Sequence, residues 1–213
     1  GVTSATSSSV AGASVVGSAM GGLSPRDNPP MTNAPDTVMA DTVAWLEKAV
    51  IGLNLCPFAK SVHVKGQIRH VVSEALSPEG LLGQLAEELR HLAATAPEVT
   101  DTTLLIVPGL LADFLDFNDF LGAAEALPAE LGLDGEIQVA SFHPQFQFAG
   151  TEPDDITNYT NRAPYPTLHL IREASIDRAV EVFPEAEMIF ERNIETMEQL
   201  GHAGWAELFP STR

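Results

Sequence analysis

Apolar residues recur along this chain with two different spacings, one typical of helices and one typical of strands. Repeats that place apolar side chains on one face of a helix predict helices over 41–53, 77–94, 113–131, 175–182 and 184–200. Short apolar or alternating runs predict strands over 68–72, 102–107, 136–142 and 167–171. Helices and strands therefore alternate along most of the chain.

Local signals mark the ends of some of these helices. Asp41 and Ser77 are residue types that cap helix N-termini, and Pro78 takes the first helical position, where a missing N–H costs nothing. Pro128 lies inside the predicted helix 113–131 and is expected to bend or split it, because proline cannot donate a backbone hydrogen bond.

The order of the elements predicts the fold class. Three strands are each preceded by a helix, and the fourth follows a long loop. Helices between successive strands favour parallel pairing through right-handed crossovers. We therefore expect a single domain over 37–205, of the α/β or α+β class, with a four-stranded mixed sheet covered by helices. The pattern leaves the strand order open.

Residues 1–36 differ in composition from the rest of the chain. Ser, Ala, Gly, Val and Thr dominate an uncharged stretch up to Ser24, and the turn-rich segment 25–30 follows. Such a composition cannot bury enough apolar surface to order itself, so a disordered extension outside the domain is predicted. Three interpretations stay open: a flexible tail, translated sequence upstream of Met31 or Met39, or an organellar targeting segment.

The charge balance argues against two classes of partner. Eleven Lys and Arg oppose 29 Asp and Glu in 213 residues, which gives a net charge of −18. This charge repels nucleic-acid phosphates and anionic membrane surfaces. No apolar run approaches the ~18 residues of a membrane span. The single cysteine fits a reducing compartment, so a cytoplasmic location is expected, or an organellar one if the extension is a targeting segment.

The polar segment 143–166 between the last two predicted strands is the first candidate site. Loops of this length inside compact domains are uncommon and tend to be functional. This one combines aromatic residues with amides, carboxylates and an arginine, as expected for an ordered loop that lines a pocket. The alternative is an Ω-loop that only packs on the edge of the sheet.

Two residues of this loop are candidates for chemistry. His143 directly follows a predicted strand, and ligand crevices of α/β sheets lie at the carboxyl ends of strands. It could be a general base or a metal ligand, or a histidine that only hydrogen-bonds the backbone. Arg162 could hold a carboxylate or phosphate, or bridge to a nearby acid and order the loop.

Oxygen-bearing side chains of the loop are candidates for binding. Asp154 and Asp155, with Asn158 nearby, could bind a hard cation or a substrate. Asn161 is a further candidate for contacting a substrate. Adjacent acids in a loop can equally cap a turn or stay solvated.

The last predicted strand adds two more candidates. A period of two places His169 on one face with Thr167 and Ile171, opposite Leu168 and Leu170. His169 could share a site with the loop, or be a half-buried structural residue. Arg172 at the end of this strand could contact an anion or stay solvated.

Cys56 is the candidate outside the loop. It directly precedes Pro57, which can start a helical turn, and a thiolate there is stabilised by unpaired backbone N–H groups and by the nearby Lys60. Cys56 could therefore be a reactive thiol. A lone cysteine between Leu55 and Phe58 can also be a small buried apolar residue.

Several strings of residues together resemble a known family. They are Asn54-Leu55-Cys56-Pro57-Phe58-Ala59, Ser141-Phe142-His143-Pro144, Gln147-Phe148-Ala149-Gly150-Thr151, Asn161-Arg162-Ala163-Pro164-Tyr165-Pro166, Leu168-His169-Leu170 and Glu191-Arg192-Asn193-Ile194. The chain resembles the bacterial and plastid-related "domain of unknown function 1415" proteins over about 43–200. The resemblance implies no reaction, but it implies that the candidates between Cys56 and His169 belong to the family's motifs. Ala163 stands where a serine is expected.

Three functional hypotheses follow. The first is an enzyme for a small polar or anionic metabolite, with His143 as acid or base, Arg162 as anion clamp and Cys56 as nucleophile or redox group. The second is a non-catalytic metal- or ligand-binding module that uses Cys56, His143 and His169. The third is an adaptor whose loop contacts a partner protein. The sequence specifies no cofactor and no oligomeric state.

Overall fold

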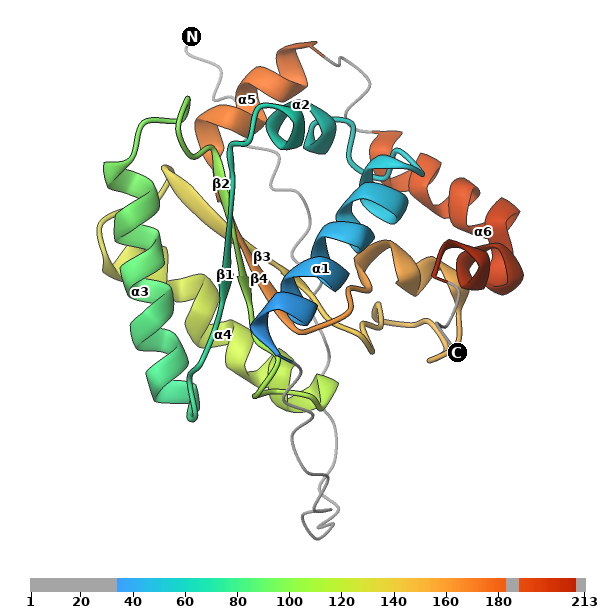
Figure 1. Ribbon diagram of the computed structural model, residues 1–213, viewed down its shortest axis with the longest axis horizontal. Coiled ribbons are helices and arrows are strands. Elements are labelled where there is room, and N and C mark those ends of the chain that lie inside the picture. The colour runs from blue at the N-terminus through green and yellow to red at the C-terminus, as the bar shows by residue number, and fades with distance from the viewer. Residues whose placement is uncertain (1–33, 183–187, 210–213) are drawn as a thin grey trace, which may run out of the picture.

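A computed structural model describes residues 34–182 and 188–209 of the chain (Figure 1). The elements in chain order are α1 (Pro35–Trp45), the π-helix η1 (Leu46–Ile51), α2 (Ala59–Val64), β1 (Ile68–Val72), α3 (Pro78–Ala94), β2 (Thr102–Ile106), α4 (Phe114–Glu130), β3 (Ile137–Phe142), the 3-10 helix η2 (Ile156–Asn161), β4 (Thr167–Arg172), α5 (Glu173–Val182) and α6 (Ile189–Leu208). Residues 1–33 of the predicted extension 1–36 and the start of the last predicted helix lie outside the described residues.

The four strands form one mixed sheet in the order β1-β2-β4-β3. β1 and β2 are parallel, as expected, but β4 is antiparallel to both of its neighbours. The strands that follow helices, β1, β2 and β3, thus run in one direction, as expected, and β4 runs opposite to them and makes the sheet mixed, as predicted. The reason is that β3 and β4 are joined by a loop that folds back on itself without a long helix, so β4 returns between β2 and β3.

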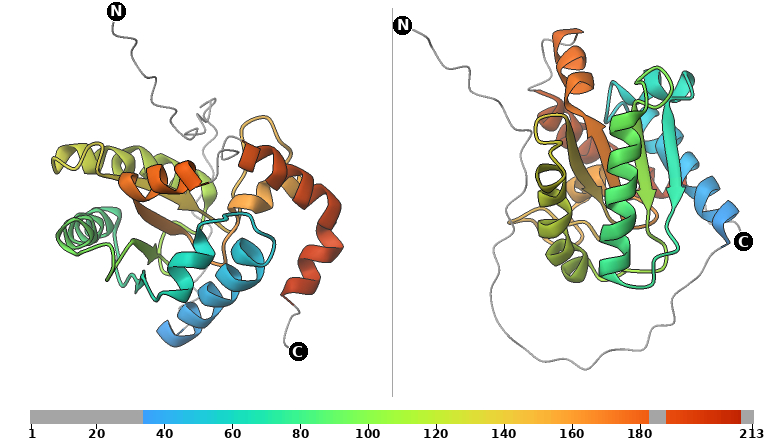
Figure 2. Two further views of the ribbon diagram at one scale, coloured as in Figure 1. Left: turned by 90° about the horizontal axis from the view of Figure 1, so that it is seen from above. Right: turned by 90° about the vertical axis from the view of Figure 1, so that its left-hand side faces the viewer.

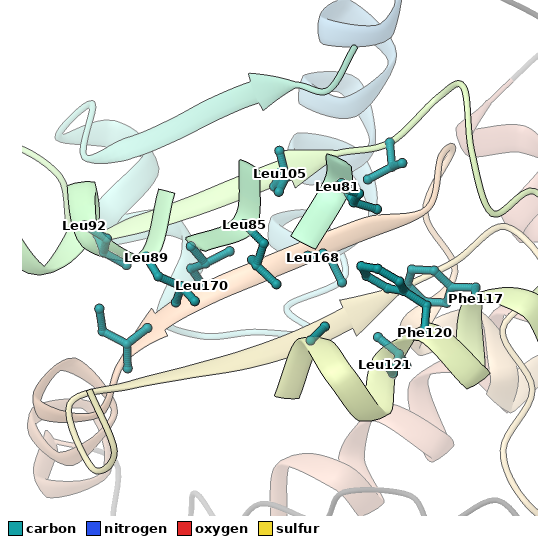
Figure 3. Close-up of a cluster of buried hydrophobic side chains, with 13 residues drawn as sticks. Leu81, Leu85, Leu89, Leu92, Leu105, Phe117, Phe120, Leu121, Leu168 and Leu170 are labelled. Carbon is teal, nitrogen blue, oxygen red and sulfur yellow. The ribbon is translucent and has the colours of Figure 1, made fainter. Parts of the chain in front are cut away.

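One face of the sheet packs against α3 and α4 (Figure 2). Four leucines of α3 and the aromatic side chains of α4 meet the inward-facing leucines of β2 and β4 (Figure 3). The fully buried members include Leu81, Leu85, Leu89, Leu92, Leu105, Phe117, Leu168 and Leu170. Each such side chain contributes about 1.5–3 kcal/mol of transfer free energy, so this cluster is the main core.

The other face of the sheet packs against α1 and η1 (Figures 1 and 2). Trp45 and Ala49 are buried here, and the Trp45 ring meets Phe142 of β3 edge-on at a centroid distance of 5.1 Å. Val38 of α1 covers Leu104 and Ile106 of β2. The layers are thus α3 and α4, the sheet, and α1 with η1.

Several helix ends differ from the predicted ones. The helix expected from Asp41 begins at Pro35, where proline fits the first turn, and continues as a π-helix. Ser77 caps α3 as predicted, accepting a hydrogen bond from Gly80 N–H. Pro128 lies inside α4, which continues to Glu130, so the proline does not split the helix. In the part of the chain that the structure describes, no helix is long and apolar enough to cross a membrane.

Candidate functional site

The loop predicted to be the site is held together by its own side chains. Asn158 of η2 is fully buried at its centre. Its Oδ1 accepts hydrogen bonds from Phe148 N–H at 2.9 Å and from the Thr151 hydroxyl at 2.8 Å, and its Nδ2 donates to the Glu152 carbonyl at 2.9 Å. The Asn158 amide is therefore occupied by loop backbone and cannot also contact a substrate.

Arg162, Asp155 and Asn161 of the loop are also engaged within it. Arg162 donates to the Phe146 and Pro153 carbonyls and stacks on the Tyr159 ring at 4.1 Å. Asp155 caps η2 by accepting from Thr157, and these hydrogen bonds lower the pKa of its carboxyl group. Asn161 accepts one hydrogen bond from the Thr160 hydroxyl through its side chain and another from His143 N–H through its backbone carbonyl. The last candidate, Asp154, is exposed.

His143 is fully buried on the α4 side of the sheet. Its Nδ1 accepts from Gln145 N–H at 3.0 Å, so Nε2 carries the proton and donates to the Leu111 carbonyl at 3.0 Å. The ring lies 5.3 Å from Phe114 and 4.9 Å from Phe117, between centroids, and burial lowers the pKa of the imidazole. Both ring nitrogens are bonded to backbone groups. Of the roles expected for His143, this arrangement matches the histidine that only hydrogen-bonds the backbone.

Arg172 joins β4 to the end of α3. Its guanidinium donates to the carbonyls of Leu92 and Thr95 at 2.6 Å and to that of Thr100 at 3.1 Å. The Leu92 carbonyl lies in the last turn of α3 and the Thr95 carbonyl at its C-cap, where carbonyl groups lack the usual helical N–H partner four residues on. Arg172 therefore fastens a helix end through Nη2 of its guanidinium group.

A pocket of about 840 Å³ lies on the opposite face of the sheet. Its floor is the sheet and its walls come from η1, from the segment around α2 and from α5. The apolar members of the lining include Trp45, Leu46, Val50, Phe58, Ile68, Leu104, Ala140, Phe142, Ile171 and Ile176. The polar members of the lining are Cys56, Ser61, Lys65, Gln67, Glu98, Asp101, Thr102, His169, Ser175 and Arg178.

The turn that carries Cys56 is fixed from two sides. The Val50 carbonyl at the end of the π-helix accepts from Leu55 N–H at 2.9 Å and from Cys56 N–H at 3.4 Å. Asn193 of α6 donates to the Leu55 carbonyl at 3.0 Å. Gly52 permits this arrangement, because a Cβ there would lie 2.2 Å from the Lys48 carbonyl oxygen. Cys56 is thus held at a defined place in the pocket wall.

The electrostatics of Cys56 favour the thiol over the thiolate. Burial raises the pKa of the Cys56 thiol, and this effect outweighs the opposing hydrogen bonds from the backbone of Phe58 and Ala59. A resting thiolate nucleophile at this position is therefore disfavoured.

His169 reaches the pocket from β4, on the face that the alternation predicted. Its neighbours across the sheet are Leu104 of β2 and Ala140 of β3, both part of the lining. Its Nε2 lies 2.7 Å from the hydroxyl oxygen of Thr102. Burial lowers the pKa of the imidazole from 6.5 to about 4, so the ring is neutral at neutral pH.

Asp101, Ser175 and Arg178 form a polar cluster in the pocket lining. The Ser175 hydroxyl donates to the Asp101 carboxylate at 2.7 Å, and Arg178 donates to the Ser175 hydroxyl at 2.8 Å. The Arg178 guanidinium also lies 3.6 Å from Asp101. These contacts fasten the start of α5 to the loop before β2.

The structure separates the residues that were expected to act together. His143 stacks on α4, whereas Cys56 and His169 lie in the pocket on the other face. Within residues 34–182 and 188–209, no three His, Cys, Asp or Glu side chains form a group that could hold a metal ion. The predicted metal set of Cys56, His143 and His169 is therefore not assembled.

Comparison with known proteins establishes the family. The sequence profile described as "protein of unknown function (DUF1415)" matches residues 37–207. The chain belongs to the DUF1415 family. No curated protein and no solved structure gives a significant match.

The family strings of this DUF1415 protein meet around the pocket and the loop. The Cys56 turn and His169 line the pocket, and Asn193, from the last string, holds the Cys56 turn. Ala163, where a serine was expected, is buried and packs with Trp45. A serine hydroxyl there would lie among apolar side chains, which accounts for the fit of alanine in this protein.

Sequence reasoning missed part of the pocket. The pattern places Thr102 in a strand and Trp45 in a helix, as observed, but gives no sign that both residues line the pocket. Ser175 and Arg178 lie one helical turn apart, so both fall on one face of α5. This spacing is a sequence signal by which the two residues could have been recognised as neighbours. Asp101 carried no signal in the sequence, because its role depends on α5 packing beside it.

Proposed function

We propose that this DUF1415 protein binds a small, mainly apolar organic molecule in the pocket on the α1 side of the sheet. One observation supports this above all: a cavity of about 840 Å³ whose lining is mainly apolar and also carries polar side chains, Cys56 and His169 among them. The volume falls in the range typical of small-molecule sites, which combine apolar walls with a few placed polar groups.

The lining favours a ligand with a flat or branched apolar body. Trp45, Phe58 and Phe142 supply aromatic faces, and Leu104 and Ile171 supply aliphatic ones. The proposal keeps the small molecule of the first sequence hypothesis but moves its site from the loop to the pocket. It also takes the ligand to be mainly apolar rather than mainly polar, because His143, Asn158 and Arg162 are engaged by backbone groups of the protein.

Fluorescence titration with anilinonaphthalene sulfonate, an aromatic probe that brightens in apolar sites, tests the proposal. Ala140→Phe places a bulky ring in the pocket, beside His169, without touching the α3 and α4 core. Ala126→Phe adds the same ring on the exposed face of α4 and is the matched control. We expect Ala140→Phe to weaken probe binding by about tenfold or more, equivalent to ~1.4 kcal/mol, and Ala126→Phe to leave it unchanged.

The tryptophans provide an independent readout. Trp45 lines the pocket, whereas Trp205 of α6 packs against Tyr159 of the loop. In a Trp205→Phe variant, the remaining emission from Trp45 should be quenched in step with probe binding. The proposal would be contradicted if Ala140→Phe and Ala126→Phe bound the probe with equal affinity and the probe left the Trp45 emission unchanged.

A further inference from the structure

We propose that His169 selects the ligand by accepting, at Nδ1, a hydrogen bond from a hydroxyl or N–H group of the bound molecule. The inference rests on the function proposed above and adds the ligand class: aromatic or branched apolar molecules that carry a hydrogen-bond donor, such as phenols. The geometry points to this class through a chain of two hydrogen bonds.

The proton positions follow from the Thr102 hydroxyl, which has a single hydrogen to give. Thr102 Oγ1 lies 2.6 Å from the carbonyl oxygen of Leu170, a group that can only accept. The hydroxyl hydrogen therefore points to Leu170. Towards His169 Nε2, at 2.7 Å, the Thr102 oxygen must then be the acceptor. Nε2 carries the imidazole proton, and Nδ1 of the neutral ring carries a lone pair.

The lone pair on Nδ1 is available to a ligand. Among the described residues, none donates a hydrogen bond to His169 Nδ1, and His169 lines the pocket. The titratable and charged side chains that line the same pocket are Cys56, Lys65, Glu98, Asp101 and Arg178. Burial holds the pKa of the imidazole at about 4, so the acceptor persists through the neutral range.

An acceptor in an apolar pocket discriminates between ligands. A ligand with a donor replaces the hydrogen bond that Nδ1 otherwise makes to water, whereas a ligand of the same shape without a donor leaves Nδ1 unpaired. A site of this kind rejects the analogue that lacks the polar group more strongly than a purely apolar pocket would. We expect a preference of about tenfold or more.

Two probes that differ in a single hydrogen-bond donor test the inference: α-naphthol and its methyl ether, both used to displace anilinonaphthalene sulfonate. In the unmodified protein, α-naphthol should bind about tenfold or more tightly than the ether. His169→Phe keeps a ring but removes the acceptor, and should abolish the preference. His91→Phe, the same change at an exposed position of α3, should retain it.

A second variant and a spectroscopic readout separate ligand recognition from packing. Thr102→Val removes the oxygen that fixes the proton on Nε2, so the preference should shrink although the shape of the pocket is kept. In proton–nitrogen NMR correlations of the unmodified protein, α-naphthol should shift the His169 Nδ1 resonance and the ether should not. Because it uses the unmodified protein, the NMR measurement tests the inference even if His169→Phe does not fold.

The failures of the two proposals are distinguishable. Equal affinity for both probes, with binding still lost in Ala140→Phe, would overturn the role of His169 and keep the pocket as the binding site. Binding that Ala140→Phe leaves unchanged would overturn the proposed function and the inference with it.

Discussion

The neutral imidazole of His169 makes stability depend on pH in a way that can be calculated. Its pKa falls from 6.5 in the unfolded chain to about 4 in the fold. Between these values the unfolded chain binds a proton that the folded protein does not, so the free energy of unfolding decreases as the pH falls. A shift of one pKa unit corresponds to 1.36 kcal/mol, which gives a loss of about 3 kcal/mol by about pH 4 and about 2 kcal/mol by about pH 5.

His169→Gln removes the titration and keeps a side-chain N–H for Thr102. We expect the free energy of unfolding of the unmodified protein to fall by about 2 kcal/mol more than that of the variant between about pH 7 and about pH 5. Urea denaturation followed by circular dichroism measures both. The pKa values of His70 and His143 are also lowered, but these residues titrate in both proteins, so the difference isolates His169.

Parallel pH profiles of the two proteins, within about 0.5 kcal/mol, would refute the reasoning, because they would mean that the fold does not hold His169 neutral. Direct titration of the imidazole by NMR gives the same answer without a variant. If the titration midpoint of the His169 imidazole were near pH 6.5, the ring would be partly protonated near neutral pH, and its proposed role as a hydrogen-bond acceptor would lose support.

Three further predictions concern the Cys56 turn and the loop. Iodoacetamide should modify Cys56 slowly, with an apparent pKa above that of an ordinary thiol, and bound α-naphthol should slow the reaction further. An apparent pKa below the ordinary value would restore the reactive-thiol hypothesis. Asn158→Ala should lower the free energy of unfolding by about 3 kcal/mol in urea denaturation, because loop N–H and hydroxyl groups lose their acceptor; a loss below about 1 kcal/mol would mean that water replaces it. Gly52→Ala should cost about 2 kcal/mol by overpacking against the Lys48 carbonyl, whereas Gly122→Ala, with open space in α4, should not destabilise; equal effects would contradict the close approach.

The sequence was most informative where a pattern and a local signal agreed. β1 and α3 occupy the predicted residues, and the alternation in β4 placed His169 opposite Leu168 and Leu170. These features depend on neighbours within a few positions, so they can be read along the chain. The helix 113–131 was predicted almost in full, although the effect of Pro128 was overestimated.

The candidate site was harder to predict, because a polar residue shows its chemistry but not its partners. His143, Asn158 and Arg162 looked available for a ligand, yet each is engaged by backbone groups. The bond that orients His169 comes from Thr102, on a strand that precedes it far along the chain. Such pairs form only when the sheet assembles.

By itself, the sequence determined the four strands, the longer helices and the residue types that could do chemistry, because these depend on local propensity and periodicity, whereas the short helices α2 and η2 were not predicted. Only the tertiary structure decided the direction of β4, the separation of His143 from Cys56 and the pocket that Cys56 shares with His169. The physical reason is that packing joins faces contributed by distant segments. Those contacts fix which polar atoms are already paired and which remain open to a ligand.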